Sequence, residues 1–342
     1  MKKIVLFGAG AQLQKFLNYC KLNVQMQETE IIAICDNDSQ KHGKHVGKFT
    51  ILHPDILNEL IYDGIVITTQ YVSEIREQLI SFYGVKSKIH TIDEYIRLET
   101  IAYNVCINEK RNRGVILSKE DIFNSNSLVI YTAIIGDYDE LKDPEFIQDG
   151  ISYVCFTDNP RITSDIWDVR YVVGGADPRQ VVREYKVLPH KFLSDYETSI
   201  WIDASFTICG DLVAFIMEYQ KHAPMLLFPH YERICIYDEA AVCISNSIEE
   251  KEVILRQINQ YYNEGYPLNE GLVCGGFLVR QHHNLEIQSL MEEWWKAICD
   301  FSKRDQISLP YLMRKNNIYY DLCDLYIQNN VWIKNNRHKF LK

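Results

Sequence analysis

The residue best placed for chemistry is Asp203, which follows the apolar run 198–202 and precedes Ala204 and Ser205. A strand that ends at Asp203 before a turn presents the carboxylate at the C-terminal edge of an open α/β sheet, where such sheets bind ligands. Oxygen ligands there can hold Mn²⁺ or Mg²⁺, and the cation offsets charge on a diphosphate leaving group. We therefore expect Asp203 and Ser205 to bind a divalent metal, although an Asp at a strand end is also a common turn residue.

Two basic residues precede this strand on a helix predicted over 179–192. Arg183 and Lys186 are three positions apart, so they share one helix face. An arginine fork and a lysine point charge together can clamp a diphosphate. A solvated basic face is the alternative interpretation. The phosphate-binding role is favoured because Pro189 and His190 lead directly into the Asp203 strand.

A second place for chemistry is the glycine loop near the N-terminus. Gly8 and Gly10 follow a predicted strand over 3–7 and open a predicted helix, where a nucleotide phosphate would meet backbone N–H groups. Asp36 ends the next predicted strand, near where a ribose-binding acid belongs. Leu13 stands where the dinucleotide motif has its third glycine, which disfavours NAD. Two interpretations stay open: a nucleotide or nucleotide-sugar site, and a degenerate domain that only supports its neighbour.

The elements that would position these residues alternate between strand and helix periods, which predicts parallel sheets with right-handed crossovers. The polar, charged segment 101–126 is the predicted linker, with a short connecting helix. Ser247 and Glu250 form a predicted capping box at the start of a helix. Strands are predicted at 3–7, 30–35, 64–68, 85–92, 128–134, 151–156, 168–173, 198–202, 225–229 and 273–279, and the helices of the second half at 179–192, 210–221, 248–263, 285–301 and 305–315.

The composition is typical of a globular protein of two domains. The 342 residues include 36 Lys and Arg against 46 Asp and Glu, and the net charge of −10 argues against nucleic-acid binding, which requires a basic surface. The ten cysteines form no C-x-x-C pair and are expected as free thiols in a reducing cytoplasm. Neither a signal peptide nor an apolar run of about 20 residues is recognisable. We expect a cytoplasmic protein that reaches any membrane-linked substrate by peripheral association.

Sequence blocks in the second half carry a family resemblance. They are YTAIIGDYDEL (131–141), VCFTDNP (154–160), VVREYKVLPHKFL (181–193), LLFPHYERICIYDEA (226–240), GYPLNEGLVCGGFLVRQH (265–282) and FSKRDQISLPYL (301–312). The sequences of these blocks and their order resemble a family of glycosyltransferase-like domains of plants and bacteria. The family includes plant proteins called alkaline ceramidase and mucilage-related. The N-terminal segment resembles the N-terminal domain of bacterial sugar O-acyltransferases and nucleotide-sugar-modifying enzymes. The resemblances imply an α/β protein: a Rossmann-like parallel-sheet domain over 1–100, then a GT-A-like glycosyltransferase domain over 127–342.

The resemblance to the glycosyltransferase-like family also implies roles for further residues. Structural interpretations compete with some of them, because residues 157–160 have turn chemistry and acids are common at helix starts. Grouped by expected role, they are Thr132, Ala133 and Asp158 for the donor, beside Arg183 and Lys186; His230, Gly275, Gly276 and Arg304 for the acceptor; and Asp305, Glu270 and Asp238 for catalysis.

Together these features predict a metal-dependent glycosyltransferase. It would transfer a sugar from a nucleotide-sugar donor, a UDP-sugar in the first instance, to a glycan or lipid-linked glycan acceptor in bacterial surface polysaccharide biosynthesis. Three alternatives stay open. An NAD-dependent or nucleotide-sugar-modifying enzyme would be centred on Gly8 and Gly10. A ceramidase-like amide hydrolase would need a metal-bound water with histidine ligands, and a glycan-binding module would turn over no donor.

Overall fold

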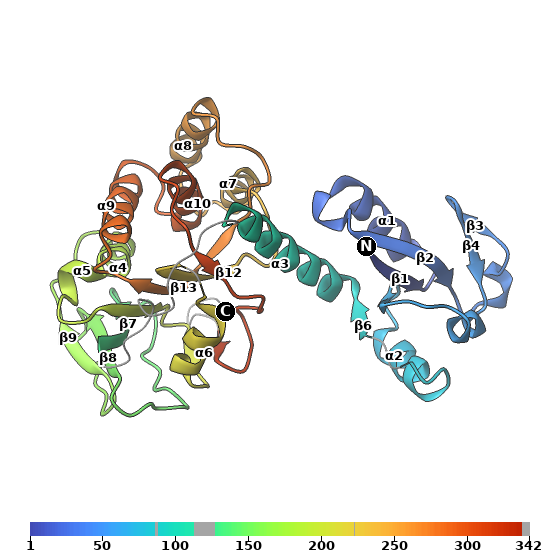
Figure 1. The fold of residues 1–342 in the computed structure, drawn as a ribbon, viewed down its shortest axis with the longest axis horizontal. Coiled ribbons are helices and arrows are strands. Elements are labelled where there is room, and N and C mark those ends of the chain that lie inside the picture. The colour runs from blue at the N-terminus through green and yellow to red at the C-terminus, as the bar shows by residue number, and fades with distance from the viewer. Residues whose placement is uncertain (86–87, 113–126, 222, 337–342) are drawn as a thin grey trace. The chain divides into compact units, whose positions relative to one another are not determined.

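The computed structural model describes residues 1–85, 88–112, 127–221 and 223–336 (Figure 1). The chain forms two compact units, Met1–Thr100 and Ile101–Lys342. Both are α/β, a Rossmann-like unit followed by a GT-A-like unit, as the sequence predicts. The division falls within helix α3 (Ile92–Arg111), so residues 101–111 of the predicted linker are helical. Residues 113–126 of that linker lie outside the described residues.

The N-terminal unit is a sheet with helices on both faces. The parallel strands alternate in burial direction because successive side chains point to opposite faces: Ile4 and Leu6 pack with α1 (Ala11–Leu22), whereas Val5 and Phe7 pack with α2 (Val72–Ser81). Its strands, in spatial order, are β3 (His45–Val46), β4 (Phe49–Leu52), β2 (Thr29–Cys35), β1 (Lys2–Phe7), β5 (Gly64–Ile67) and β6 (Lys88–Thr91), with β3 antiparallel to β4 and the other pairs parallel.

The second unit is built on a larger mixed sheet. In spatial order its strands are β14 (Asp321–Leu322), β12 (Met225–Pro229), β13 (Val273–Gln281), β10 (Thr198–Ile202), β7 (Leu128–Ile134), β8 (Ser152–Thr157) and β9 (Asp168–Tyr171). Strand β13 runs antiparallel to both neighbours, and the remaining pairs are parallel. A small antiparallel pair, β11 (Phe206–Ile208) and β15 (Ile333–Asn335), follows the end of β10. The helices are α4 (Pro178–Val187), α5 (Pro189–Phe192), α6 (Leu212–Tyr219), α7 (Ile236–Ser245), α8 (Lys251–Asn263), α9 (Leu285–Asp300) and α10 (Asp305–Lys315).

Two apolar cores lie on the two faces of this sheet. Along β7, Val129, Tyr131 and Ala133 pack into the core shared with α4 and α7 to α10, whereas Ile130 and Ile134 pack into the core shared with α6, β11 and β15. The strands of the sheet centre are apolar on both sides because both faces are covered. This arrangement fixes the C-terminal ends of β7 and β10 side by side, since the two strands are directly paired and parallel.

The structure changes three local predictions. The helix expected over 179–192 is divided into α4 and α5 at Pro189, which lacks the N–H that would continue the first helix. The capping box is wrong, because α8 begins with Glu250 as its N-cap without a side-chain cap, and Ser247 has a positive φ of 52°. Helix α7 is additional, since the sequence predictions left 236–245 without an element.

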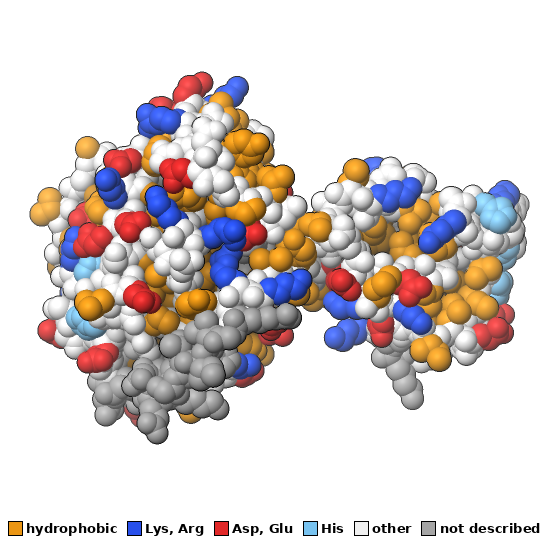
Figure 2. Space-filling model, turned by 45° about the horizontal axis from the view of Figure 1, so that its top comes forward, with side chains coloured by type: hydrophobic (Ala, Val, Ile, Leu, Met, Phe, Trp, Pro, Cys, Tyr) orange, Lys and Arg blue, Asp and Glu red, His pale blue; other side chains and the backbone are white. Residues whose placement is uncertain are grey.

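Surface charges are mixed rather than segregated. On the face drawn in Figure 2, Lys and Arg side chains alternate with Asp and Glu side chains over each unit. Across the described residues, no helix combines the length and the apolar character needed to cross a membrane.

Candidate active site

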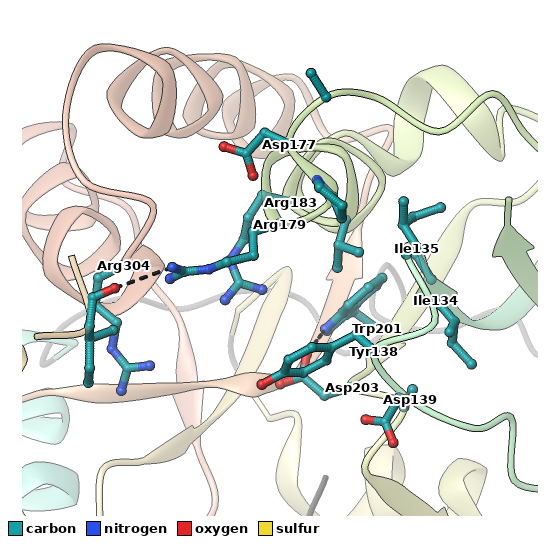
Figure 3. A pocket seen from close by; sticks show the side chains of 17 residues that line it. Ile134, Ile135, Tyr138, Asp139, Asp177, Arg179, Arg183, Trp201, Asp203 and Arg304 are labelled. Atoms are coloured by element: carbon teal, nitrogen blue, oxygen red, sulfur yellow. Dashed lines mark hydrogen bonds between the residues drawn. The ribbon is translucent and has the colours of Figure 1, made fainter. Parts of the chain in front are cut away.

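Two adjoining cavities lie at the C-terminal ends of β7 and β10. The larger has a volume of about 820 Å³ and the smaller about 180 Å³. Arg183, Asp203 and Arg304 line both. In Figure 3, Arg179 and Arg183 extend from α4 into the larger cavity, on the side opposite Asp203. The junction of a large and a small cavity at this sheet edge is a suitable place for a ligand with two parts.

The wall of the larger cavity is shaped by a glycine turn. Gly136 follows β7 with a φ of 74°, and a Cβ there would lie 2.9 Å from Cγ of Pro178, the first residue of α4. The Gly136 N–H donates to Asp158 Oδ1 at 3.0 Å. Asp177 caps α4 by accepting from the N–H of Gln180. Asp158 therefore fixes the turn after β7 and does not itself line the cavity.

A buried cation lies between two carboxylates at the junction. Lys186 has a side chain only 1% exposed, and its ammonium forms an ion pair with Asp305 and lies 3.9 Å from Oδ1 of Asp203. Arg183 Nε is 3.7 Å from Oδ2 of Asp305. Asp203 is 31% exposed, and its Oδ1 accepts from the indole N–H of Trp201 at 2.7 Å (Figure 3). Asp203 is thus the carboxylate of this group that faces the cavities.

The cations and carboxylates of this group stabilise each other's charged forms. Burial opposes ionisation of Asp305, but Arg183, Lys186 and Arg304 outweigh it and hold the pKa of Asp305 well below its ordinary value. Burial lowers the pKa of the Lys186 ammonium, and the carboxylates of Asp305 and Asp203 oppose that shift. Asp305 is therefore an ionised partner of cations and is poorly suited to take up a proton from a substrate hydroxyl.

A second buried carboxylate fixes the arginines of the smaller cavity. Glu239, on α7, is fully buried and accepts from Nε of Arg233 at 2.5 Å and from Nε of Arg304 at 2.8 Å. His230 Nδ1 accepts the backbone N–H of Glu232 and of Arg233, both at 3.1 Å. Burial first, and then Arg233, lowers the pKa of His230 to about 3. The imidazole is therefore neutral and shapes the loop that carries Arg233.

Two glycines leave room for the buried ion pair. A Cβ on Gly275 would lie 2.8 Å from Oδ2 of Asp305 and 2.9 Å from Nζ of Lys186. A Cβ on Gly276 would lie 3.1 Å from the ring of Phe206. Both glycines are on β13 and line the smaller cavity. A side chain at Gly275 would therefore displace the Lys186–Asp305 pair.

The structure brings together most of the predicted site residues. Those that line one or both cavities are Ala133, Arg183, Lys186, Asp203, Ser205, His230, Gly275, Gly276, Arg304 and Asp305. Four others of the second unit lie elsewhere. Thr132 is buried on β7, and its hydroxyl has no hydrogen-bond partner among the described residues. Asp158 bonds to the Gly136 turn, Asp238 is exposed on α7, and Glu270 forms ion pairs with Arg111 and Arg314.

The residues around Asp203 do not fit the divalent cation that the sequence predicts. Oδ1 of Asp203 accepts from Trp201 and lies 3.9 Å from the ammonium of Lys186, so a cation held by Asp203 would be left with Oδ2 and would lie close to this ammonium. Ser205 is buried and offers only a neutral hydroxyl. Across the described parts of the chain, no three His, Cys, Asp or Glu side chains gather closely enough to hold a metal ion.

Sequence reasoning assigned no role to Arg233, Arg179, Trp201 and Tyr138, and it chose Asp238 over the neighbouring acid Glu239. Glu239 had a detectable signal. It occupies a position in the stripe of α7 otherwise formed by Ile236, Ala240 and Cys243, and a carboxylate in a buried stripe requires a cationic partner. Tyr138, by contrast, lies in the loop after β7, where no period in the sequence points to a cavity.

The predicted nucleotide site of the N-terminal unit is a separate cavity of about 430 Å³. Gly8, Gly10 and Asp36 line it together. Asp36 Oδ2 accepts from the Ala9 N–H at 2.6 Å and from Lys41 Nζ at 2.9 Å. Burial would raise the pKa of Asp36, but these donors hold it below its ordinary value. The carboxylate thus braces the glycine loop, and nucleotide binding there stays a prediction.

Comparisons with known proteins agree with this division of the chain. Residues 1–92 match the family described as C2185-like, N-terminal, and residues 82–339 match the TOD1/MUCI70 glycosyltransferase-like domain. The resemblance of the N-terminal unit to sugar O-acyltransferases stays a prediction. No curated protein matches. The crystal structure of UDP-D-quinovosamine 4-dehydrogenase from Vibrio fischeri is 24% identical to this chain, over 26% of this chain and 76% of that chain, with a TM-score of 0.23.

The second match spans the sheet, both cavities and every helix from α4 to α10. It covers well over half of the chain, and it supports glycosyltransferase activity for this protein. The chain therefore belongs to the TOD1/MUCI70 glycosyltransferase-like family.

Proposed function

We propose that the protein transfers a sugar from a nucleotide-sugar donor, a UDP-sugar in the first instance, to a glycan or lipid-linked glycan acceptor in surface polysaccharide biosynthesis. The observation that carries the proposal is the pair of cavities that share Arg183, Asp203 and Arg304 at the C-terminal edge of the sheet. One cavity is large enough for a nucleotide, and the shared residues supply both charge signs where the two cavities meet.

The larger cavity suits the nucleotide of the donor. Its walls combine the apolar side chains of Ile134 and Ile135 with the exposed ring of Tyr138, and the guanidinium groups of Arg179 and Arg183 enter from α4 (Figure 3). A base stacks favourably on an aromatic ring, and guanidinium groups bind phosphate oxygens through paired hydrogen bonds. The donor would therefore lie with its base near Tyr138 and its diphosphate toward the junction.

The transfer then takes place at the junction. The acceptor hydroxyl oxygen forms a bond to the anomeric carbon, and the bond from that carbon to the diphosphate oxygen breaks with its electron pair on the leaving nucleoside diphosphate. The hydroxyl proton passes to a base or to water. Asp305 and Glu239 are held by cations, so Asp203, which is partly exposed, is the carboxylate placed to accept a hydrogen bond from the acceptor hydroxyl or to contact the reacting sugar.

The test is the release of nucleoside diphosphate from a panel of nucleotide sugars, resolved by ion-exchange chromatography. The full chain is compared with Arg183→Ala and with Arg256→Ala, a matched control whose exposed guanidinium on α8 bonds to the carbonyl of Asp300, outside both cavities. Losing a hydrogen bond to a charged group costs about 1.5–3 kcal/mol, so Arg183→Ala should slow release by about 10- to 150-fold. Equal rates for both variants, or no turnover of any donor by the wild type, would contradict the proposal. Turnover of nicotinamide cofactors or of ceramide instead would favour the alternative enzymes.

A further inference from the structure

The position of Lys186 has a consequence for how the donor diphosphate is held, provided that the proposed function is correct. The Lys186 ammonium is almost completely buried, and it contacts Asp305 while lying 3.9 Å from Asp203. It also lies 5.8 Å from the centre of the Trp201 ring, on which a cation is favoured. Gly275 leaves room for the ammonium, since a Cβ added there would lie 2.9 Å from Nζ. Lys186 thus lies between the two acids, whose carboxylates oppose the lowering of its pKa by burial.

A divalent cation would compete with this ammonium for the same oxygens. Oδ2 of Asp305 bonds to Lys186, and Oδ1 accepts from the N–H of Gln306 at 3.1 Å. The oxygen of Asp203 on the Lys186 side accepts from Trp201. Three of the four carboxylate oxygens are therefore paired with protein groups. Within the described residues Oδ2 of Asp203 is the one left, and a second cation there would meet the repulsion of Lys186 at close range.

Positive charge for the phosphates is available on the other side of the junction. Arg183 uses Nε on the Lys303 carbonyl at 3.4 Å, and Arg304 uses Nε on Glu239. Arg179 bonds through Nη1 to the carbonyl of Ile248 at 3.2 Å (Figure 3). Within the described residues, the terminal nitrogens of Arg183 and Arg304 bond to no other protein group, so each keeps a fork for phosphate oxygens.

We propose that this glycosyltransferase binds the diphosphate of its nucleotide-sugar donor without a divalent cation. The Lys186 ammonium lies between Asp203 and Asp305 in place of a metal, and the guanidinium groups of Arg179, Arg183 and Arg304 carry the positive charge that offsets the leaving diphosphate. These groups are positioned before the donor arrives, because Asp305 holds Arg183 and Glu239 holds Arg304. Such preorganised donors need little rearrangement when charge develops on the leaving group.

Isothermal titration calorimetry with UDP as the probe, and GDP and inorganic pyrophosphate in parallel, tests this directly. The wild-type chain is titrated in excess EDTA and, separately, in excess Mn²⁺. We expect a nucleoside diphosphate to bind in EDTA, with a Kd that Mn²⁺ changes by less than about threefold. Arg183→Ala should weaken the binding in EDTA by about tenfold or more, and Arg256→Ala should leave it unchanged.

The outcomes separate this inference from the proposed function. Binding that requires Mn²⁺, or that Mn²⁺ strengthens tenfold or more, overturns metal-independent binding and leaves the glycosyltransferase proposal standing. No binding of any of the three probes in either condition overturns both.

A second measurement examines Lys186 itself. In Lys186→Met the two acids lose their shared ammonium, and a divalent cation could bridge them. Mn²⁺ should therefore raise the Tm of Lys186→Met but not that of the wild type. The matched control is Lys191→Met, whose ammonium pairs with Glu292 at 2.7 Å outside both cavities, and Mn²⁺ should leave its Tm unchanged. A wild type that Mn²⁺ stabilises as strongly as Lys186→Met overturns the inference. If the variant fails to fold, the wild-type calorimetry decides.

Discussion

The substitution Glu239→Gln removes a charge on which two arginines of the candidate site depend. Glu239 is completely buried, and its two oxygens accept from Arg233 and Arg304. Removing one partner of a buried ion pair costs about 3–5 kcal/mol. The arginine side chains keep 18% and 26% exposure, and glutamine retains one acceptor oxygen, so we expect a loss of about 2–3 kcal/mol. In a domain of this size that loss lowers Tm by about 4–12 °C.

The pH dependence of the Tm difference between wild type and Glu239→Gln tests the same prediction a second time. Burial alone would raise the pKa of Glu239, but Arg304, His230 and Arg233 hold it below its ordinary value. A carboxylate with a depressed pKa in the folded state stabilises fully above its unfolded pKa of about 4.3, and this stabilisation is lost as the pH falls through the folded value. The difference in Tm between wild type and Glu239→Gln should therefore be full at pH 7 and should narrow on acidification below about pH 4.3.

The control is Glu232→Gln, which removes the carboxylate of a second glutamate that pairs with Arg233. Glu232 pairs with Nη1 of Arg233 at 3.0 Å but is 54% exposed, and pairs of that kind contribute about 0–1 kcal/mol. Thermal unfolding followed by fluorimetry should therefore separate Glu239→Gln clearly from Glu232→Gln. A Tm loss for Glu239→Gln no larger than that of Glu232→Gln would refute the reasoning that buried Glu239 organises these arginines.

Three further predictions concern the site. Gly275→Ala places a methyl group within 2.9 Å of the Lys186–Asp305 pair and should cost about 1–3 kcal/mol in unfolding free energy, so an unchanged urea midpoint would contradict the crowding. Burial lowers the pKa of His230 to about 3, so its contribution to the free energy of unfolding is full above about pH 6.5 and falls as the pH is lowered. The Tm of the wild type should therefore fall more than that of His230→Asn between pH 7 and pH 5. Equal falls in Tm would refute this. Tyr138→Ala should weaken UDP binding by about 1–3 kcal/mol while Tyr138→Phe binds as the wild type, and equal affinity of all three would argue against stacking.

Much of the fold was predictable because its sheets are buried on both faces. Continuous apolar runs such as 128–134 and 198–202 read as central parallel strands, and both are confirmed at residue level. The position of Asp203 at the sheet edge follows from the same pattern, since a polar residue must come where the buried run ends. The pair β11 and β15 was not predictable, because it joins segments more than a hundred residues apart in strands of three residues each.

The chemistry of the site was less accessible, because residue type does not say what a side chain contacts. Lys186 looks like the solvated end of a basic helix face, yet it is buried against Asp305, a residue 119 positions away. The sequence therefore favoured Lys186 as a phosphate ligand and Asp305 as a catalytic acid, whereas the structure makes each the partner of the other. Glu270 was likewise expected to take part in catalysis, but it lies outside both cavities and its carboxylate pairs with Arg111 and Arg314.

We propose that a sugar is transferred from a nucleotide donor at the edge of the second sheet, around Asp203. The most direct measurement is nucleoside diphosphate release by the full chain, with Asp203→Asn as the test variant and Glu232→Gln as the control. Asparagine keeps the shape and an oxygen for the Trp201 N–H, so the fold is preserved while the carboxylate charge is lost. We predict that wild type and Glu232→Gln turn over the same donor and that Asp203→Asn loses at least tenfold, about 1.4 kcal/mol of transition-state stabilisation. A folded Asp203→Asn protein with wild-type turnover would contradict the account.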